Sequence, residues 1–422
     1  MKIKTYLVAT LLSVCVSGHV QGQETEKTFI KENMEFAAKQ CGLMLQTPSK
    51  GKAVMPHSLS KNGTPSKGSV YLWTAGFFPG TLWYVSQYTD NKALQDSALV
   101  YTKKMEPVKT FTDNHDIGFM MYCSYGNANR FAPDKTYDDI LVESARSLCT
   151  RFHEKSGTIQ SWNGFRSWHG DKVYDYPVII DNMMNLELLF FASKKTGDDT
   201  FRKIAISHAE KTMENQVRND YSCYHIVYYD KATGKPIKGE TSQGYSDNSA
   251  WSRGQAWGIY GFTMVYRETK DPRFLKTAQK MADFYINHPN LPSDKVAYWD
   301  FNAYQNGYTP GIRSNANKIV ANYRDASAAA TVASALLELS TYTKGKKGEQ
   351  YLAIAKEILH SLGSPAYRAK EGANGNFILM HCVGSIPHNS EIDVPLTYAD
   401  YYFTEALYRY DRLLNNLSLF EN

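Results

Sequence analysis

Two aspartates lie at the start of segments that are otherwise apolar, where a proton donor could be buried. Asp181 lies in the stretch YPVIIDNMMNLELLFF, and Asp116 follows His115 directly in NHDIGFMM. Removal from water raises the pKa of a carboxyl group, so either aspartate could stay protonated near neutral pH and act as a general acid. An aspartate at a helix start can equally cap the helix by accepting a backbone N–H bond. The residues alone leave both interpretations open.

A third motif combines a guanidinium with an indole. Arg253 and Trp257, in SRGQAWGIY, are four apart and share one face of a helix. The guanidinium fork can pair with a carboxylate while the ring stacks on a sugar, so the two side chains suit an acidic sugar. A cation–π pair that only supports the fold is the alternative. Asp325, in YRDASAAA, is interpreted as the cap of a helix of small residues.

Composition excludes several classes of function. The sequence contains no Walker loop, no HExxH, no GxSxG and no dinucleotide-binding glycine pattern. Its histidines lack the spacing of a metal cluster and its 6 cysteines form no CxxC pair, so we expect no metal and no cofactor. A net charge of +5 is too small to indicate nucleic acid. The 30 tyrosines and 7 tryptophans suit either sugar stacking or packing between helices.

The elements that must position these residues are predicted to be paired helices. Apolar or small-residue helices are expected at 71–88, 116–126, 179–196, 251–267, 324–342 and 396–413. Amphipathic helices alternate with them, at 25–45, 91–106, 136–153, 199–216, 272–287 and 347–361. This alternation predicts an all-α fold of six helical hairpins in two concentric layers, an (α/α)6 barrel. Two turn-rich intervals, 157–178 and 220–250, are natural places for substrate contacts.

The N-terminus has the layout of an export signal. Two lysines precede a short apolar stretch, and Gly22 offers a cleavage point. That stretch is too short to span a bilayer, and no later one predicts a membrane span. We therefore expect a signal peptide at 1–22 and a single domain at 23–422. The expected location is the periplasm, with a lipid anchor on Cys15 or secretion as alternatives, and the oligomeric state stays open.

A series of segments, in this order, resembles the unsaturated glucuronyl hydrolase family, glycoside hydrolase family eighty-eight. The segments are LWTAGFFPGTLW, HDIGF, IDNMMNLE, WSRGQAWG and YRDASA, and the resemblance extends over residues 30–412. It implies an (α/α)6 barrel, in agreement with the helical repeat. It also implies removal of the unsaturated uronic acid that polysaccharide lyases leave, by protonation at C4 of the C4=C5 double bond and addition of water at C5.

The resemblance implies a role for each candidate residue. Asp181 matches the general acid/base, and Asp116 matches the second essential acid. The residues that match the substrate pocket are Trp73, His115, Trp162, His225, Gln243, Arg253 and Trp257.

One late loop departs from the family's pattern. Members that prefer certain sulfated substrates resemble one another in carrying Ser-x-x-Ser-x-Lys, whereas this chain has GSIPHNSE. Ser385 is kept, and His388 and Ser390 replace the second serine and the lysine. Ser385 therefore stays a substrate-binding candidate, and the resemblance does not extend to tight binding of that sulfate pattern.

Two other functions are compatible with the sequence. The related unsaturated rhamnogalacturonyl hydrolases use the same fold and chemistry on pectin fragments, although LWTAGFFPG resembles the glucuronyl family more. A non-catalytic glycan-binding protein would need neither acid, and Asp116 and Asp181 are both present. The expected partner is thus an unsaturated acidic di- or oligosaccharide from glycosaminoglycans.

Overall fold

The structure is a computed structural model that describes the backbone of residues 4–60 and 62–420 and the side chains from residue 22 onward. The predicted signal peptide begins in residues 1–3, outside the described part, and continues into the first helix. None of the helices in the described part combines the length and the apolarity that a membrane span requires.

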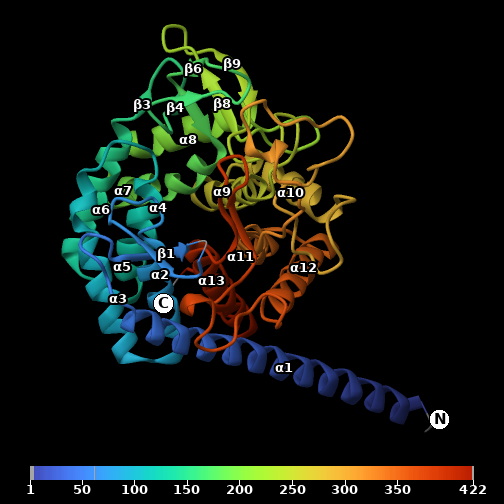
Figure 1. Cartoon of the computed structure of the whole chain (residues 1–422). Coiled ribbons are helices and arrows are strands. Elements are labelled where there is room, and N and C mark those ends of the chain that lie inside the picture. The colour runs from blue at the N-terminus through green and yellow to red at the C-terminus, as the bar shows by residue number, and fades with distance from the viewer. Residues whose placement is uncertain (1–3, 61, 421–422) are drawn as a thin grey trace.

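Helices dominate the described chain and fall into two sets that alternate along it (Figure 1). The apolar set comprises α2 (Phe77–Thr89), α4 (Ile117–Met121) continued by η2 (Tyr122–Gly126) and α5 (Asn127–Phe131), η3 (Ile180–Asn185) continued by α7 (Leu186–Thr196), α9 (Ser252–Thr269), α11 (Ala326–Tyr342) and α13 (Thr397–Leu414). The amphipathic set comprises α1 (Lys4–Gln46), α3 (Lys92–Lys104), α6 (Lys135–Cys149), α8 (Asp199–Asn215), α10 (Pro272–Asn287) and α12 (Lys346–Leu362). The predicted helices are therefore present, in the predicted order.

Two helix starts differ from the prediction. The first apolar helix was expected at 71–88 and begins only at Phe77, because Pro79 has no N–H to bond back to an earlier turn. The amphipathic helix expected at 25–45 is continuous with the apolar stretch before it, since no proline separates them. Figure 1 shows this longer α1 extending away from the other helices at its N-terminal end.

Contacts within the apolar set close on themselves. α2 packs on η2 and α5, α4 on η3 and α7, η3 on α9, α9 on α11, α11 on α13, and α13 returns to α2. The amphipathic helices lie against this series, with α3 on α2, α8 on α7, α10 on α9 and α12 on α11. Small residues make the close packing possible: α11 reads ASAAATVASALLELSTY and is buried along nearly its whole length. A helix that is apolar all round needs neighbours on every side, which this arrangement provides.

Short antiparallel strand pairs and turns connect the helices. The strands are β1 (Met55–Leu59) with β2 (Pro65–Gly68), β3 (Phe152–His153) with β4 (Thr158–Ile159), β5 (Phe165–Arg166) with β6 (Val173–Tyr174), β7 (Pro177–Ile179) with β8 (Ile226–Tyr229) and β9 (Pro236–Glu240), and β10 (Cys382–Ser385) with β11 (Ser390–Val394). Further short helical turns are η1 (Glu106–Thr110), η4 (Asn315–Asn317) and η5 (Asn374–Asn376). The turn-rich intervals of the prediction thus contain β4 to β9.

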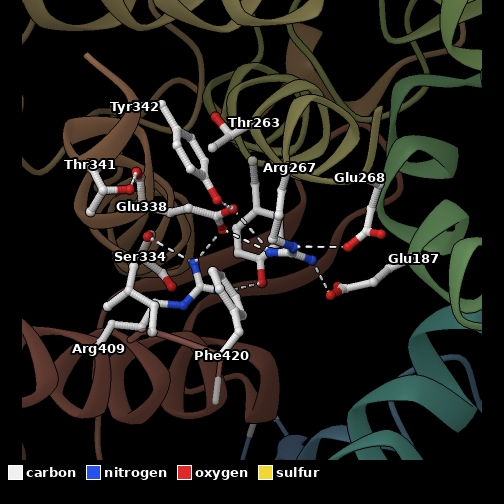
Figure 2. Close-up of polar contacts among 12 residues, drawn as sticks. Glu187, Thr263, Arg267, Glu268, Ser334, Glu338, Thr341, Tyr342, Arg409 and Phe420 are labelled. Atoms are coloured by element: carbon white, nitrogen blue, oxygen red, sulfur yellow. Dashed lines mark hydrogen bonds and ion pairs between the residues drawn. The ribbon is translucent and has the colours of Figure 1, made fainter. Parts of the chain in front are cut away.

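Buried charges join four of the apolar helices, in the C-terminal halves of α9, α11 and α13 and at the start of α7 (Figure 2). Arg267 of α9 pairs with Glu338 of α11 at 3.0 Å and contacts Glu187 of α7. Arg409 of α13 reaches the same Glu338 at 3.3 Å. The ring of Phe420 covers both guanidinium groups, 4.0 Å from Arg267 and 5.2 Å from Arg409. One acidic side chain therefore links three helices in surroundings where an unpaired charge would be costly.

We expect Arg267→Met to lower stability strongly, because the substitution leaves Glu187 without its paired cation and Glu338 with Arg409 alone. Removing one partner of a buried pair costs about 3–5 kcal/mol. Differential scanning calorimetry measures the change. The control is Lys92→Met, which breaks an exposed 2.8 Å pair with Asp96 and should cost less than about 1 kcal/mol. Equal losses in the two variants would contradict a stabilising role for the buried network.

Candidate active site

The candidate residues gather at the N-terminal ends of the apolar helices. Asp116 directly precedes α4, Asp181 lies in η3 ahead of α7, and Arg253 is the second residue of α9. Tyr398 holds the same place in α13. The backbone N–H groups of a helix N-terminus carry partial positive charge, so this end of the molecule favours an anionic ligand.

A cavity of about 490 Å³ opens among these helix ends. The predicted site residues that line it are Trp73, Trp162, Gln243, Arg253 and Ser385. The other lining residues are Gly164, Phe165, Ser242, Gly384, His388, Ser390, Glu391 and Tyr398. Small-molecule pockets span roughly 300–1,000 Å³, so the cavity has the size that a short oligosaccharide end needs.

Aromatic rings form the walls of this cavity. Trp73 packs 5.0 Å from Tyr398 and 5.9 Å from Phe77, which fixes its orientation. Trp162 lies 5.7 Å from Phe165 on the other side. Such rings present flat apolar faces, on which the C–H faces of a sugar can stack.

Neither candidate acid caps its helix. Asp116 occupies the N-cap position of α4 without a capping hydrogen bond, and Asp181 lies inside η3 behind Ile179. Both are buried, at 8% and 7% exposure. The Oδ2 atom of Asp181 has no hydrogen-bond partner among the described residues. The capping interpretation is therefore wrong for both residues, and their carboxyl groups remain available for chemistry.

Burial controls the protonation of this pair. It raises the pKa of Asp181 to about 7, against the opposing charge of Arg253. Burial and then repulsion from Asp181 raise the pKa of Asp116 to about 8, against the lowering effect of Arg151. Two carboxyl groups that interact in this way titrate as a pair, and near neutral pH the pair retains a proton that it can donate.

A neutral imidazole faces Asp181. The Nδ1 atom of His225 accepts two backbone N–H bonds, from Ser242 and Gln243, both 3.0 Å long. Because Nδ1 is an acceptor, the hydrogen-bond network assigns the ring proton to Nε2, which lies 3.6 Å from Asp181 Oδ2. Burial lowers the pKa of His225 well below its usual value, so the ring stays uncharged.

A second imidazole faces Asp116 in the same way. The Asn185 amide is oriented by the Phe119 N–H, which donates to Asn185 Oδ1 at 2.8 Å. The amide nitrogen of Asn185 therefore points to His115 Nδ1, 3.4 Å away. This assigns the proton of His115 to Nε2, 3.4 Å from Asp116 Oδ1. Burial lowers the pKa of His115 to about 3. Each acid thus faces a donor that carries no charge.

Arg253 has a different role from the one that its sequence motif suggested. Its Nη1 donates to Asp325 at 3.0 Å and to the carbonyl of Val383. Its Nη2 donates to Gln243 at 2.8 Å and to the carbonyl of Gly384 at 2.7 Å. A guanidinium carries four N–H bonds on its two Nη atoms, and the protein uses all of them. The fork that was expected to hold a ligand carboxylate instead holds the β10–β11 hairpin.

Trp257 lies behind the cavity rather than in its wall. It has 0% exposure and packs against Phe119 at 5.3 Å and Tyr402 at 5.4 Å. Its indole N–H interacts with the Asp181 carboxyl and opposes the rise of that residue's pKa. In this structure its ring supports the cavity from below and offers no open stacking face.

Asp325 caps α11 as predicted, by accepting the Ser327 N–H at 3.1 Å. Its pairing with Arg253 was not foreseen, because the two lie on different helices. Asn185 was also missed, although a polar side chain inside the apolar stretch IDNMMNLELL was a visible signal. Glu391 gave no signal in the sequence, since its place in the wall depends on the fold of the hairpin.

One group of side chains has the spacing of metal ligands although the sequence predicted none. Ligand atoms of His169, Glu240 and Asp247 lie within 4.8 Å of one another. Each already has a protein partner: His169 Nε2 contacts Asp247 at 2.8 Å, and Glu240 accepts from Ser167 and Tyr228. These bonds account for the cluster as a polar link between β9 and the adjoining loops.

Asp181→Asn is expected to stabilise the protein, and more at high pH than at low pH. A carboxyl whose pKa rises to about 7 on folding contributes stability below its unfolded value, and this is lost as the pH rises through 7. The amide substitution removes that penalty, which is on the order of a few kcal/mol. Thermal unfolding at about pH 5 and about pH 8 measures it. Asp171→Asn, at an 85% exposed side chain, is the control. A pH-independent difference would contradict the raised pKa.

Fold and site together define a mostly helical protein with two buried carboxyl groups of raised pKa near a cavity lined by aromatic rings. Comparisons with known proteins identify its family. The model of Glycosyl Hydrolase Family 88 matches residues 52–412. An unsaturated glucuronyl hydrolase from Formosa agariphila is 45% identical over 343 residues, which are 81% of this chain and 80% of that relative.

Solved structures agree with this match. The crystal structure of an unsaturated glucuronyl hydrolase specific for heparin is similar with a TM-score of 0.83 and 42% identity, over 94% of this chain and 100% of that chain. A mutant unsaturated glucuronyl hydrolase from Streptococcus agalactiae, complexed with dGlcA-GalNAc6S, has a TM-score of 0.72 and 30% identity, over 90% and 91% of the two chains. The chain belongs to Glycosyl Hydrolase Family 88, which confirms the family resemblance found in the sequence.

Proposed function

We propose that the protein is an unsaturated glucuronyl hydrolase, which releases the 4,5-unsaturated uronic acid from glycosaminoglycan oligosaccharides made by lyases. The observation that carries the proposal is the buried acid pair, Asp181 and Asp116, near Arg253 and the aromatic cavity that Arg253 lines, in a chain of this family. The names of the relatives support the substrate class, since they are glucuronyl and chondroitin disaccharide hydrolases.

Asp181 is assigned the proton transfers. Its carboxyl gives a proton to C4 of the C4=C5 double bond, and the resulting positive charge at C5 is shared with the ring oxygen. Water adds at C5 and returns a proton to Asp181, which restores the acid. The hemiketal formed at C5 opens to a ketone, and the hemiacetal left at C1 then releases the neighbouring sugar. The sequence of steps consumes one water.

The groups around Asp181 support this assignment. Neutral His225 presents an Nε2–H donor with no hydrogen-bond partner among the described residues, so a ligand oxygen can accept from it. Neutral His115 faces Asp116 and also interacts with the side chain of Asn182. We assign Asp116 to positioning the substrate. Its carboxyl group, either protonated or charged, lies close to the reacting atoms. No carboxylate needs to attack the anomeric carbon, which distinguishes this hydration from an ordinary retaining glycosidase.

The closed series of contacts among the apolar helices supports an (α/α)6 barrel, with the amphipathic helices as its outer layer. We propose that residues 23–422 form one catalytic domain in that barrel, and that 1–22 serve as a signal peptide. The signal supports export, with the periplasm as the proposed location and a lipid anchor or secretion as the alternatives. Cell fractionation that finds the full-length chain inside the cytoplasm would contradict it.

The first test is loss of near-ultraviolet absorbance from unsaturated chondroitin, hyaluronan and heparin disaccharides. Wild type should consume the double bond, and Asp181→Asn should lower kcat by roughly 10²–10⁴-fold, the usual contribution of a general acid. Asp116→Asn should also lower kcat. Asp113→Asn, at an exposed aspartate beside the site, is the matched control.

Failure on all three substrates would reject the glucuronyl activity. Turnover of unsaturated pectin fragments would then favour the rhamnogalacturonyl alternative, and tight binding without turnover would favour a glycan-binding protein. A reaction in D₂O separates hydration from direct hydrolysis, because only protonation at C4 places deuterium on that carbon.

The pH dependence of kcat/KM should report the acid. The active form carries the proton on Asp181, so kcat/KM should fall as the pH rises through about 7, where that proton is lost. A profile measured with the disaccharide that is turned over fastest tests this. Activity that stays constant to well above that pH would exclude Asp181 as the proton donor.

A further inference from the structure

Glu391 places a carboxylate in the cavity wall that the reaction does not use. The residue lies on β11, lines the cavity and has a side chain that is 25% exposed. Its Oε1 atom contacts Nε2 of His57, and His57 Nδ1 lies 2.9 Å from Thr74 Oγ1. β1, the turn before α2 and β11 therefore cooperate to hold one acidic group in place.

The backbone around Glu391 is also unusual. Glu391 has φ of 55°, and its neighbours Asn389 and Asp393 have φ of 53° and 56°. Residues other than glycine rarely adopt this left-handed conformation. On the facing strand, a Cβ at Gly384 would come within 2.3 Å of Glu391 Oε2. Only glycine leaves room for the carboxylate at its present position.

The charge of the cavity wall is set by the side chains that line it. Among the described residues that line the cavity, the formally charged side chains are Arg253 and Glu391. The Nη donors of Arg253 are all used within the protein, and its charge is paired with buried Asp325. No lysine lines the described cavity. A ligand group near Glu391 therefore meets an acceptor with negative charge, and no free cation opposes it.

The position of Glu391 determines which sugar it meets. Asp181 is buried behind the cavity lining and faces His225, which accepts hydrogen bonds from the backbone N–H groups of the lining residues Ser242 and Gln243. His388 and Ser390, in the hairpin that carries Glu391, are lining residues that are exposed. A terminal uronate must reach Asp181 to be protonated at C4. The sugar that follows it then lies toward the opening, against the hairpin.

We propose that Glu391, held by His57, is a specificity-determining residue that selects against sulfate on the sugar next to the unsaturated uronate. A carboxylate accepts hydrogen bonds from hydroxyl or amino groups but repels a sulfate. The inference rests on the proposed function and adds the substituent that the site rejects. The preferred substrates are disaccharides whose second sugar is unsulfated.

The test compares kcat/KM for unsulfated and 6-sulfated unsaturated chondroitin disaccharides. Wild type should prefer the unsulfated one. Glu391→Gln keeps the shape and removes the charge, and it should raise the sulfated-to-unsulfated ratio by roughly tenfold or more, as expected for two charges in contact near a protein surface. Glu391→Lys should raise the ratio further. The change should appear mainly in KM for the sulfated substrate, because Glu391 does not touch the reacting atoms.

The matched control is Asp393→Asn, which removes the same charge from the same strand. Asp393 pairs with His381 outside the cavity, so the ratio should not change. A thermal melt of each variant checks that it is folded. A wild-type preference for the sulfated disaccharide, or an unchanged ratio in both Glu391 variants, overturns the proposal while the hydrolase function stands. No turnover of either disaccharide by wild type rejects the proposed function and this inference together.

Discussion

The buried pair formed by Arg253 and Asp325 joins the parts of the chain that make the site. Arg253 begins α9, Asp325 caps α11, and the remaining Nη donors of Arg253 hold Gln243 and the β10 carbonyls of Val383 and Gly384. The free-energy cost of desolvating two charges is offset only when nearly every donor and acceptor has a hydrogen-bond partner. In this pair, all Nη donors of Arg253 have one. The position of the hairpin, and with it the outer cavity wall, depends on this contact.

Burial of the acid pair favours proton donation, but the same burial lowers the stability of the folded protein. Asp181 and Asp116 sit in apolar surroundings that raise the pKa of each, and His115 and His225 are held neutral beside them. Buried polar atoms without partners are costly in a folded protein, and several gather here. The close-packed apolar helices and the charge network at their opposite ends offset that cost. Strain and unsatisfied groups at one end of an otherwise well-packed molecule are typical of an active site.

Much of the candidate site could be predicted from local sequence. Asp181 and Asp116 interrupt apolar stretches, so their burial followed from the pattern, although capping could be excluded only from their actual hydrogen bonds. The interpretation of Arg253 as a ligand-binding fork did not anticipate the structure, because three of its four partners lie 72 or more positions away. Trp257 was expected to face the ligand, yet the helix turns that face toward Phe119 and Tyr402.

The sequence by itself determined the helices, their alternation and the family. Hydrophobic periodicity and motif order are properties of the sequence and can be recognised without coordinates. It also determined which residues could carry a proton. Only the tertiary structure decided which nitrogen of His225 faces Asp181, which acceptors occupy Arg253, and that Glu391 enters the cavity wall. These depend on contacts between segments far apart in the chain, and hydrogen bonds and burial at such contacts are set by the geometry of packing rather than by neighbouring residues.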